Sequence, residues 1–270
     1  MTNRASKPRP IRLVQLTDTH LFGDPAEDLR GVASLPALRA CVDHAADAIA
    51  AADALLVTGD VVQDDAAGYA HLRDTLAPLG KPVLCVPGNH DDVPSMRREL
   101  SQAPFRMDAH VDIGRWRFVL LDSVKPGAAG GRLAPSALAA LSDSLSTSGD
   151  RHVLICLHHQ PIDMRSRWLD AVGLENAADF FAIVDRHPNV RAIAWGHVHQ
   201  AYEGERRGVR LLSTPATCAQ FLPQSDDFAV DTRPPAYRIL ELAPDGAVHT
   251  EVVWLDRYAR RELDSSADVA

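Results

Sequence analysis

The sequence has few cysteines, no long uncharged hydrophobic run and no excess of positive charge. Its four cysteines are far apart and form no Cys-x-x-Cys pair, and Cys85 and Cys156 lie inside strand-like runs. We therefore interpret each cysteine as a buried free thiol, which favours a reducing, cytoplasmic location. No uncharged run approaches the roughly 18 residues of a membrane span, and no hydrophobic segment follows the polar first nine residues. A soluble protein without an export signal and without a membrane partner is expected.

The charge balance argues against nucleic acid as a partner. The formal net charge is −8 at pH 7, whereas proteins that bind nucleic acid broadly carry a basic stripe or patch. One basic cluster, Arg206, Arg207 and Arg210, has Glu203 and Glu205 as neighbours and is interpreted as a solvated turn. An acidic protein can still bind an anionic substrate where bound metal ions supply local positive charge.

Hydrophobic periodicity predicts a single domain over residues 11–258, with flexible segments at 1–10 and 259–270. In the first ninety residues, strand-like runs alternate with helical patterns, which predicts parallel strands with right-handed crossovers. The predicted strands are 11–16, 54–58 and 83–86, and the predicted helices are 34–49 and 67–79.

The later sequence predicts further strands and helices. Strands are expected at 116–121, 153–157 and 192–195, and helices at 135–145 and 177–185. The runs 209–213, 237–242 and 248–254 predict a second, more antiparallel sheet. The expected fold class is α/β, with two mixed β-sheets packed face to face between layers of helices. Residues 222–236 are expected to form a long loop that is either functional or merely mobile.

Five short polar segments each follow a hydrophobic, strand-like run. They are Asp18 with His20, Gly59-Asp60, Gly88-Asn89-His90-Asp91, His158-His159, and Gly196-His197-Val198-His199. Open α/β sheets place their active sites at strand ends, so these segments are expected to meet. Six of the twelve histidines lie in them. The other six histidines are interpreted as ordinary surface or core residues.

The spacing within these segments favours metal binding. On an extended strand, residues two apart point to the same face, so Asp18 and His20 could reach one metal ion, and so could His197 and His199. Glycines before the polar residues allow sharp turns and close approach to a ligand. Any one segment alone would fit an ordinary turn, because Asp, Asn and Gly dominate turns. The joint occurrence of five favours a two-metal site.

The ligand types suggest both the metals and the reaction. Carboxylate and imidazole ligands without thiolate suit Mn, Fe or Zn. One carboxylate that bridges two metal ions is the arrangement that hydrolyses phosphate esters, and Asp60 is the candidate bridge. His159 is expected either to support the ligands from behind, which we favour, or to pack in the core.

In order, the five segments resemble the DxH, GD, GNH[DE], H and GHxH blocks of the calcineurin-like metallophosphoesterase superfamily. Within it, the chain is similar to the bacterial class III 3′,5′-cyclic-AMP phosphodiesterases, and the similarity spans about residues 11 to 255. It rests on QLTDTHL, VTGDVVQD, PGNHD, LHHQP, GHVHQ and STPATCAQF. The resemblance implies the metallophosphoesterase fold, a four-layer αββα sandwich.

The resemblance also implies roles for single residues. It implies two divalent metal ions per chain, Fe²⁺ or Mn²⁺, with Zn²⁺ as an alternative. One ion would be held by Asp18, His20, Asp60 and His199, and the other by Asp60, Asn89, His158 and His197. Nucleotide would bind through His20, Asp60, Asn89, His90 and His199. His90 and Asp60 would be the catalytic residues, with His90 a non-ligand that contacts the phosphate.

The expected function is hydrolysis of 3′,5′-cyclic AMP to 5′-AMP by attack of a metal-bridging hydroxide. His90, oriented by Asp91, would protonate the leaving oxygen. The same site could instead act on glycerophosphodiesters, 2′,3′-cyclic nucleotides or phosphomonoesters. A non-catalytic metal-binding scaffold is a third interpretation. The oligomeric state stays open, with a homodimer as one option.

Overall fold

The computed structural model describes residues 9–256 and 258. Of the predicted flexible segments, residues 1–8 and 259–270 lie outside the described residues, so their flexibility stays a prediction, as does the assignment of residues 11–258 to one domain. Among the described residues, no helix combines the length and hydrophobicity that a membrane span requires.

The first sheet has six strands in the order β16-β15-β1-β4-β5-β6. Strands β1 (Ile11–Leu16), β4 (Ala54–Thr58), β5 (Val83–Val86) and β6 (Phe105–Arg106) are parallel. At the other edge, β15 (Ala236–Leu242) pairs antiparallel with β1, and β16 (Val248–Trp254) pairs antiparallel with β15. The β-α-β-α-β pattern predicted for the first ninety residues is confirmed.

The second sheet also has six strands, in the order β11-β12-β10-β9-β8-β7. Its parallel centre is formed by β8 (Trp116–Leu120), β9 (His152–Cys156), β10 (Val190–Trp195) and β12 (Val209–Ser213). Antiparallel strands β7 (His110–Ile113) and β11 (Tyr202–Arg206) form its two edges.

The prediction that the runs 209–213, 237–242 and 248–254 belong together in a second, more antiparallel sheet is wrong. Strand β12 extends the second sheet parallel to β10, while β15 and β16 join the first sheet beside β1. The buried strand β1 needs backbone partners on both edges, and β15 supplies one of them. Hydrophobic periodicity locates strands but carries no information on which strand pairs with which.

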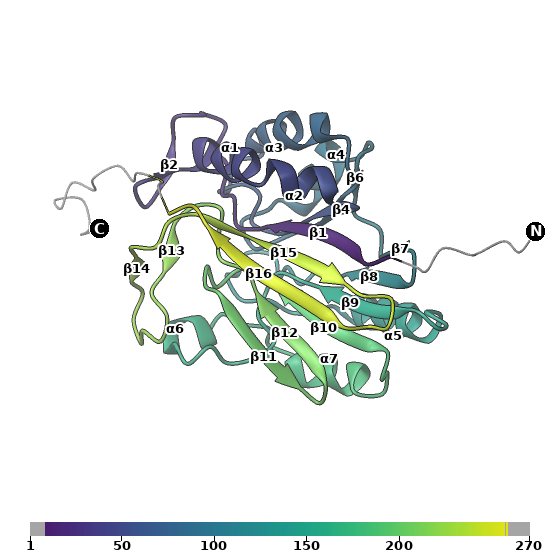
Figure 1. Cartoon of the computed structure of the whole chain (residues 1–270). Coiled ribbons are helices and arrows are strands. Elements are labelled where there is room, and N and C mark those ends of the chain that lie inside the picture. The colour runs from purple at the N-terminus through teal and green to yellow at the C-terminus, as the bar shows by residue number, and fades with distance from the viewer. Residues whose placement is uncertain (1–8, 257, 259–270) are drawn as a thin grey trace, which may run out of the picture.

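Helices cover the outer faces of both sheets (Figure 1). Over the first sheet lie α1 (Ser34–His44), α2 (Ala46–Ala51), α3 (Gly68–Leu76), a 3₁₀ turn (Ala77–Leu79) and α4 (Val93–Glu99). Helices α5 (Pro135–Ser146), α6 (Arg167–Asp170) and α7 (Ala177–Val184) lie on the side of the second sheet. The four-layer αββα fold is therefore confirmed, although the helix predicted over 34–49 is broken at Ala45 into α1 and α2.

Two short hairpins lie outside the main sheets. One pairs β2 (Asp28–Leu29) with β3 (Val32–Ala33), and the other pairs β13 (Gln220–Phe221) with β14 (Val230–Asp231). In Figure 1, β2, β13, β14 and α6 gather at the end of the molecule to which the carboxyl end of β1 points. The predicted loop at 222–236 therefore contains a strand.

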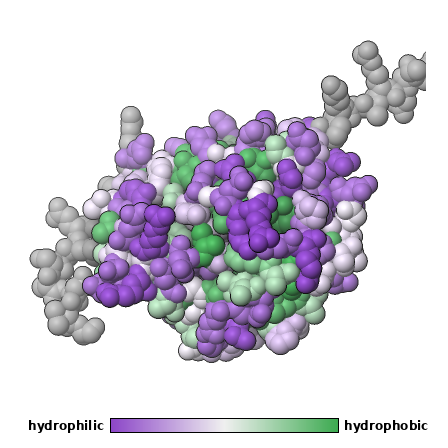
Figure 2. Space-filling view, turned by 90° about the horizontal axis from the view of Figure 1, so that it is seen from below, coloured by the Kyte–Doolittle hydropathy of each residue, from purple (hydrophilic) through white to green (hydrophobic). Residues whose placement is uncertain are grey.

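Three hydrophobic clusters fill the spaces between the four layers. The alternation of β4 shows how: Leu55 and Val57 pack against the helices of the first sheet, whereas Leu56 packs between the two sheets. A third cluster, which includes Ile155 and Ile193, lies between the second sheet and its helices. Because the central strands are buried on both faces of their sheets, they are continuous hydrophobic runs. On the outer surface, the face seen from below has hydrophilic residues spread among smaller hydrophobic areas (Figure 2).

One buried arginine forms hydrogen bonds between the two sheets. The Arg238 side chain, on β15, is fully buried. Its guanidinium donates to Glu203 Oε1 on β11 at 2.8 Å, to the Ser213 carbonyl at 2.8 Å and to Thr214 Oγ1 at 3.1 Å. Burial lowers the pKa of Arg238, and the Glu203 carboxylate opposes this shift. The planar guanidinium thus satisfies acceptors of the second sheet from a strand of the first.

We predict that Arg238→Ala lowers the free energy of unfolding by about 3 kcal/mol, because it leaves a cavity and unpaired carbonyl and hydroxyl groups at the junction of the sheets. Arg210→Ala is the matched control, since Arg210 bonds the same Glu203 carboxylate at 2.9 Å from a partly exposed position. It should change the stability by less than about 1 kcal/mol. Urea denaturation measures both, and equal effects would contradict the assigned role of Arg238.

Candidate metal site

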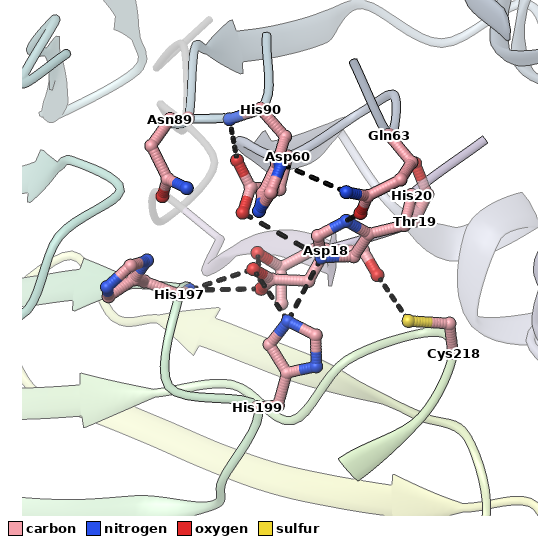
Figure 3. Close-up of polar contacts among 12 residues, drawn as sticks. Asp18, Thr19, His20, Asp60, Gln63, Asn89, His90, His197, His199 and Cys218 are labelled. Carbon is pink, nitrogen blue, oxygen red and sulfur yellow. Dashed lines mark hydrogen bonds and ion pairs between the residues drawn. The ribbon is translucent and has the colours of Figure 1, made fainter. Parts of the chain in front are cut away.

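All the site residues predicted from the sequence meet at the carboxyl ends of the strands, where the two sheets adjoin. Asp18 and His20 follow β1, Asp60 follows β4, and Asn89 and His90 follow β5. From the second sheet, His158 follows β9, and His197 and His199 follow β10. Figure 3 shows most of these side chains pointing toward one another across a small space. The expectation that the five polar segments meet is confirmed.

The side chains converge through an unusual backbone rather than through strand geometry. Positive φ angles occur at Asp18 (52°), His20 (43°), Asp60 (47°), His197 (67°) and His199 (49°). This left-handed conformation is uncommon outside glycine and costs conformational energy. The predicted extended-strand geometry is therefore wrong, although Asp18 and His20 still lie close to the same side chain, His199. His197 and His199 in fact face different groups of side chains.

The first cluster consists of Asp18, His20, Asp60 and His199. His20 Nε2 lies 3.1 Å from His199 Nε2 and 3.7 Å from Asp60 Oδ2. His199 Nε2 lies 3.4 Å from Asp18 Oδ1. The carboxylate of Asp18 is fixed by the backbone N–H of His197, which lies 2.9 Å from Oδ1.

The second cluster consists of Asp60, Asn89, His158 and His197. Three atoms lie 3.2 Å from His158 Nε2: Asp60 Oδ2, Asn89 Oδ1 and His197 Nδ1. The same Asp60 oxygen thus approaches His20 of the first cluster and His158 of the second. One carboxylate oxygen between the two clusters has the position that a bridging ligand would take.

The donor set of both clusters fits a cation. In the first cluster, His20 Nδ1 donates to Gln63 Oε1 and His199 Nδ1 donates to the Ala219 carbonyl, each at 2.7 Å. These bonds leave the lone pairs of the two Nε2 atoms facing one another at 3.1 Å. A cation held by His20 and His199 would convert this repulsion into coordination.

The second cluster also has fewer protons than its neighbouring nitrogen and oxygen atoms would need for hydrogen bonds with one another. His158 Nδ1 donates to the Thr58 carbonyl at 2.7 Å, so one further proton, at Nε2, is all that the His158 ring can offer its three neighbours. His197 Nε2 is buried and has no partner among the described residues. A divalent ion at this position would satisfy several of these acceptor atoms at once.

The pKa values follow from burial and from Asp60. Burial lowers the pKa of His20 to about 4, and burial also holds the pKa of His197 well below its usual value. Burial alone would also lower the pKa of His158, but attraction to Asp60 outweighs it and raises this pKa to about 9. Burial alone would raise the pKa of Asp60, but attraction to His158 outweighs it and holds this pKa well below its usual value. Near neutral pH, a proton on His158 thus occupies a position that suits a metal ion.

His90 lies at the partly exposed side of the site, and Asp91 does not orient it. The Asp91 carboxylate is buried and accepts from the backbone N–H groups of Val61 and Gly88 and from the Tyr69 hydroxyl. His90 Nδ1 instead lies 2.9 Å from Asp64 Oδ2 and 3.1 Å from Gln63 Nε2. The predicted role of Asp91 is therefore wrong, because the left-handed turn at Asp64 (φ 53°) brings a different carboxylate to His90.

Gln63 was missed as a site residue although it lies inside the VTGDVVQD motif. Its Oε1 accepts from His20 Nδ1, and its Nε2 donates to Asp64 Oδ2 and lies 3.1 Å from His90 Nδ1 (Figure 3). One amide thus orients a residue of the first cluster and the partly exposed histidine together. An amide next to an acid in a loop has no sequence signal of its own, because turns commonly contain such residues.

His159 packs behind the second cluster. Its ring lies 4.7 Å from that of His197 and 5.0 Å from that of His158, measured between centroids. Its Nδ1 bonds the Ser123 hydroxyl and its Nε2 donates to the Ala129 carbonyl, so neither nitrogen is left for a metal. This contact supports the expectation that His159 holds the ligand rings from behind.

The Cys218 thiol was also missed. It lies beside His20 and His199, and its Sγ donates to the Asp18 carbonyl at 3.0 Å (Figure 3). Burial raises the pKa of this thiol well above its usual value, and the Asp18 charge adds to the shift. The thiol therefore stays protonated and helps to hold the left-handed turn at Asp18.

The chain is similar to known phosphoesterases. Residues 11–201 match the model of the calcineurin-like phosphoesterase family. A 3′,5′-cyclic adenosine monophosphate phosphodiesterase from Pseudomonas aeruginosa is 37% identical over 94% of each chain. A protein of the same description from Vibrio vulnificus is 41% identical over 90% of this chain and 89% of its own. These matches confirm the family resemblance predicted from the five segments.

A solved structure supports the fold. The crystal structure of a dimetal phosphatase from Danio rerio has a TM-score of 0.63 to this chain, at 15% sequence identity. The similarity covers 92% of this chain and 99% of the fish protein. The two proteins therefore share their fold.

We predict that Gly196→Ala disrupts the site. A Cβ at this position would lie 2.2 Å from Thr17 Oγ1, 2.6 Å from Asp18 Oδ2 and 2.9 Å from the Thr58 carbonyl. The substitution should lower the stability by about 1–3 kcal/mol and the affinity for Mn²⁺ by about tenfold or more. Gly130→Ala is the control, because its Cβ would come no closer than 3.5 Å to another atom. Calorimetric titration of both variants with Mn²⁺ measures the affinity. Binding of Mn²⁺ to Gly196→Ala with the wild-type affinity would contradict the prediction.

We also predict that metal binding releases a proton from His158. The pKa of about 9 means that this imidazole is protonated at pH 7.5 in the metal-free protein, and a metal ion binds only the deprotonated form. The Mn²⁺ affinity should therefore rise about tenfold per pH unit as pH increases and should level off above about pH 9. Calorimetric titration of Mn²⁺ at pH 7.5, in buffers of different ionisation enthalpy, counts the protons. A binding enthalpy independent of the buffer would refute this linkage.

Proposed function

The chain belongs to the calcineurin-like phosphoesterase family, and on this premise we propose that it hydrolyses 3′,5′-cyclic AMP to 5′-AMP with two divalent metal ions. The substrate assignment rests on sequence identity to proteins described as 3′,5′-cyclic adenosine monophosphate phosphodiesterases. The identity is 37% and 41% over about nine tenths of the chain. The full set of side chains in the two clusters supports an active enzyme over a non-catalytic scaffold.

We propose that each cluster holds one ion. Asp18, His20, Asp60 and His199 would ligate one, and Asp60, Asn89, His158 and His197 the other. Mixed oxygen and imidazole ligands favour Fe²⁺ or Mn²⁺, and they also accept Zn²⁺. When bound, such a pair of ions polarises a phosphate ester and makes water a stronger nucleophile near neutral pH.

The side chains around the ions would position the substrate and move one proton. Asn89, His90 and His199 would contact the phosphate together with His20 and Asp60. His90 Nδ1 is engaged by Asp64 and Gln63, so its Nε2 would hold the proton that passes to the leaving 3′ oxygen.

We further propose a cytoplasmic location. All four cysteines are free and buried in the core. Free buried thiols are typical of a reducing compartment, and a cyclic nucleotide that acts as an intracellular signal would be available there.

The proposed function predicts a substrate order in a direct comparison. Mn²⁺-loaded or Fe²⁺-loaded full-length protein should hydrolyse 3′,5′-cyclic AMP with a kcat/KM at least about tenfold above that for 2′,3′-cyclic AMP, glycerophosphocholine or an aryl phosphomonoester. Asp60→Asn, which removes the shared carboxylate charge, should lose both bound metal and activity. Steady-state assays with metal analysis of each preparation test both statements.

Two outcomes would contradict the proposal. Faster hydrolysis of any of the other three substrates would reassign the substrate while leaving the metal site in place. An Asp60→Asn protein that keeps two metal ions and full activity would exclude a shared role for Asp60. Arg210→Ala serves as the control, because its charge lies on β12 away from the clusters.

A further inference from the structure

Three aromatic side chains form a group beside the first cluster. The Phe221 ring lies 5.3 Å from that of Trp168 and 5.2 Å from that of Phe228, in edge-to-face arrangements. Trp168 and Phe228 are also 5.2 Å apart, so the three rings contact one another pairwise. We call Trp168, Phe221 and Phe228 the aromatic group. It joins helix α6 to the segment between β13 and β14.

The aromatic group is in direct contact with a predicted metal ligand. The Phe221 ring stacks on the His199 imidazole with centroids 3.9 Å apart and planes 8° apart. The backbone N–H of Phe221 also donates to the His199 carbonyl. Phe228 is therefore only one ring removed from the first cluster. In Figure 1, β13, β14 and α6 lie at the same end of the molecule as the carboxyl end of β1.

Phe228 exposes an apolar ring at this position. Its exposed fraction is 43%, and among the described residues only Leu222, in the same loop and equally exposed, is another large hydrophobic residue with this degree of exposure. The guanidinium carbon of Arg30, in the turn between β2 and β3, lies 5.0 Å from the centroid of the Phe228 ring. Such a cation over a ring face helps to hold the ring in place.

The loop that carries Phe228 is held at several points. The Leu222 N–H donates to the Ala229 carbonyl at 2.8 Å, and the Trp168 N–H donates to the Asp226 carbonyl at 3.3 Å. The Ser225 hydroxyl donates to the Asp227 carbonyl at 2.6 Å. These bonds favour the first of the two interpretations of residues 222–236, a functional loop, because the exposed ring is presented from a defined backbone.

We propose that the aromatic group is a nucleobase subsite, in which the base of the nucleotide stacks on Phe228 while the phosphate lies at the two clusters. This inference rests on the proposed function, since it assumes a nucleotide whose phosphate binds there. One ribose separates phosphate from base in such a substrate, and one ring, Phe221, separates His199 from Phe228. Stacking on an aromatic ring recognises the flat face that every base offers.

The chemistry of the subsite sets its selectivity. An aromatic face and the Arg30 cation provide stacking and cation–π attraction, which do not depend on the hydrogen-bonding edge of a base. The subsite should therefore favour nucleotides over base-free sugar phosphates while distinguishing adenine from guanine only weakly. A purine covers more of an aromatic ring than a pyrimidine does, so purine nucleotides should bind more tightly.

Equilibrium binding to the Mn²⁺-loaded full-length protein tests the subsite with two probes, 5′-AMP and ribose 5-phosphate, which differ only in the base. The quantity compared is the ratio of the two affinities, 5′-AMP over ribose 5-phosphate. Phe228→Ala should lower this ratio by about tenfold, within the range found for one stacked base. Phe228→Tyr, which keeps a ring, should restore the ratio to within about twofold of the wild type. Leu222→Ala is the matched control, because it removes an equally exposed apolar side chain outside the aromatic group, and it should not change the ratio.

The outcomes separate this inference from the proposed function. An unchanged ratio in Phe228→Ala, or the same change in Leu222→Ala, would overturn the subsite, and so would a wild-type protein that binds the two probes equally well. A wild-type protein that fails to hydrolyse 3′,5′-cyclic AMP yet shows the predicted binding ratios would overturn the proposed function and support the subsite.

Discussion

The structure depends on a group of closely spaced hydrogen-bond acceptor atoms. These atoms share too few protons to form hydrogen bonds with one another. Nitrogen and oxygen atoms from five strand ends approach within about van der Waals contact, as the 3.1 Å separation of His20 Nε2 and His199 Nε2 illustrates. Burying such groups together costs free energy unless a proton or a cation offsets their repulsion. The pairing of the strands, the left-handed turns and the buried hydrogen bonds around the clustered side chains hold these atoms together.

The local backbone and the tertiary packing hold this arrangement jointly. Left-handed turns at Asp18 and Asp60 aim their carboxylates inward, and the close packing of Gly88 and Gly196 leaves no space for a Cβ beside them. Hydrogen bonds then fix the imidazole rings, as the bond from His199 Nδ1 to the Ala219 carbonyl illustrates. Polar partners of this kind orient metal ligands and raise their affinity for the ion. The strain in the turns is thus balanced by contacts from both sheets.

Much of the fold and most of the site could be predicted from the sequence. Short-range patterns located β1, β4 and β5, and the residue types and spacings of the five polar segments identified Asp60 and the other clustered residues. Three details could not be predicted in this way. The pairing of β15 with β1 depends on residues more than 200 positions apart. The separate directions of His197 and His199, and the contact between Asp64 and His90, depend on positive φ angles that non-glycine residues adopt only in a particular tertiary context.

The sequence by itself determined the reaction class, because the residue types and spacings of the DxH, GD, GNH, H and GHxH blocks specify which atoms can bind metal. Only the tertiary structure decided how those atoms are shared and what surrounds them. It placed one Asp60 oxygen between the two clusters and brought Gln63 and Asp64 into contact with His90. It also stacked the Phe221 ring on the His199 ring. The physical reason is that ligand identity is a local chemical property of each residue. Distances between residues far apart in the chain are set by the packing of two sheets.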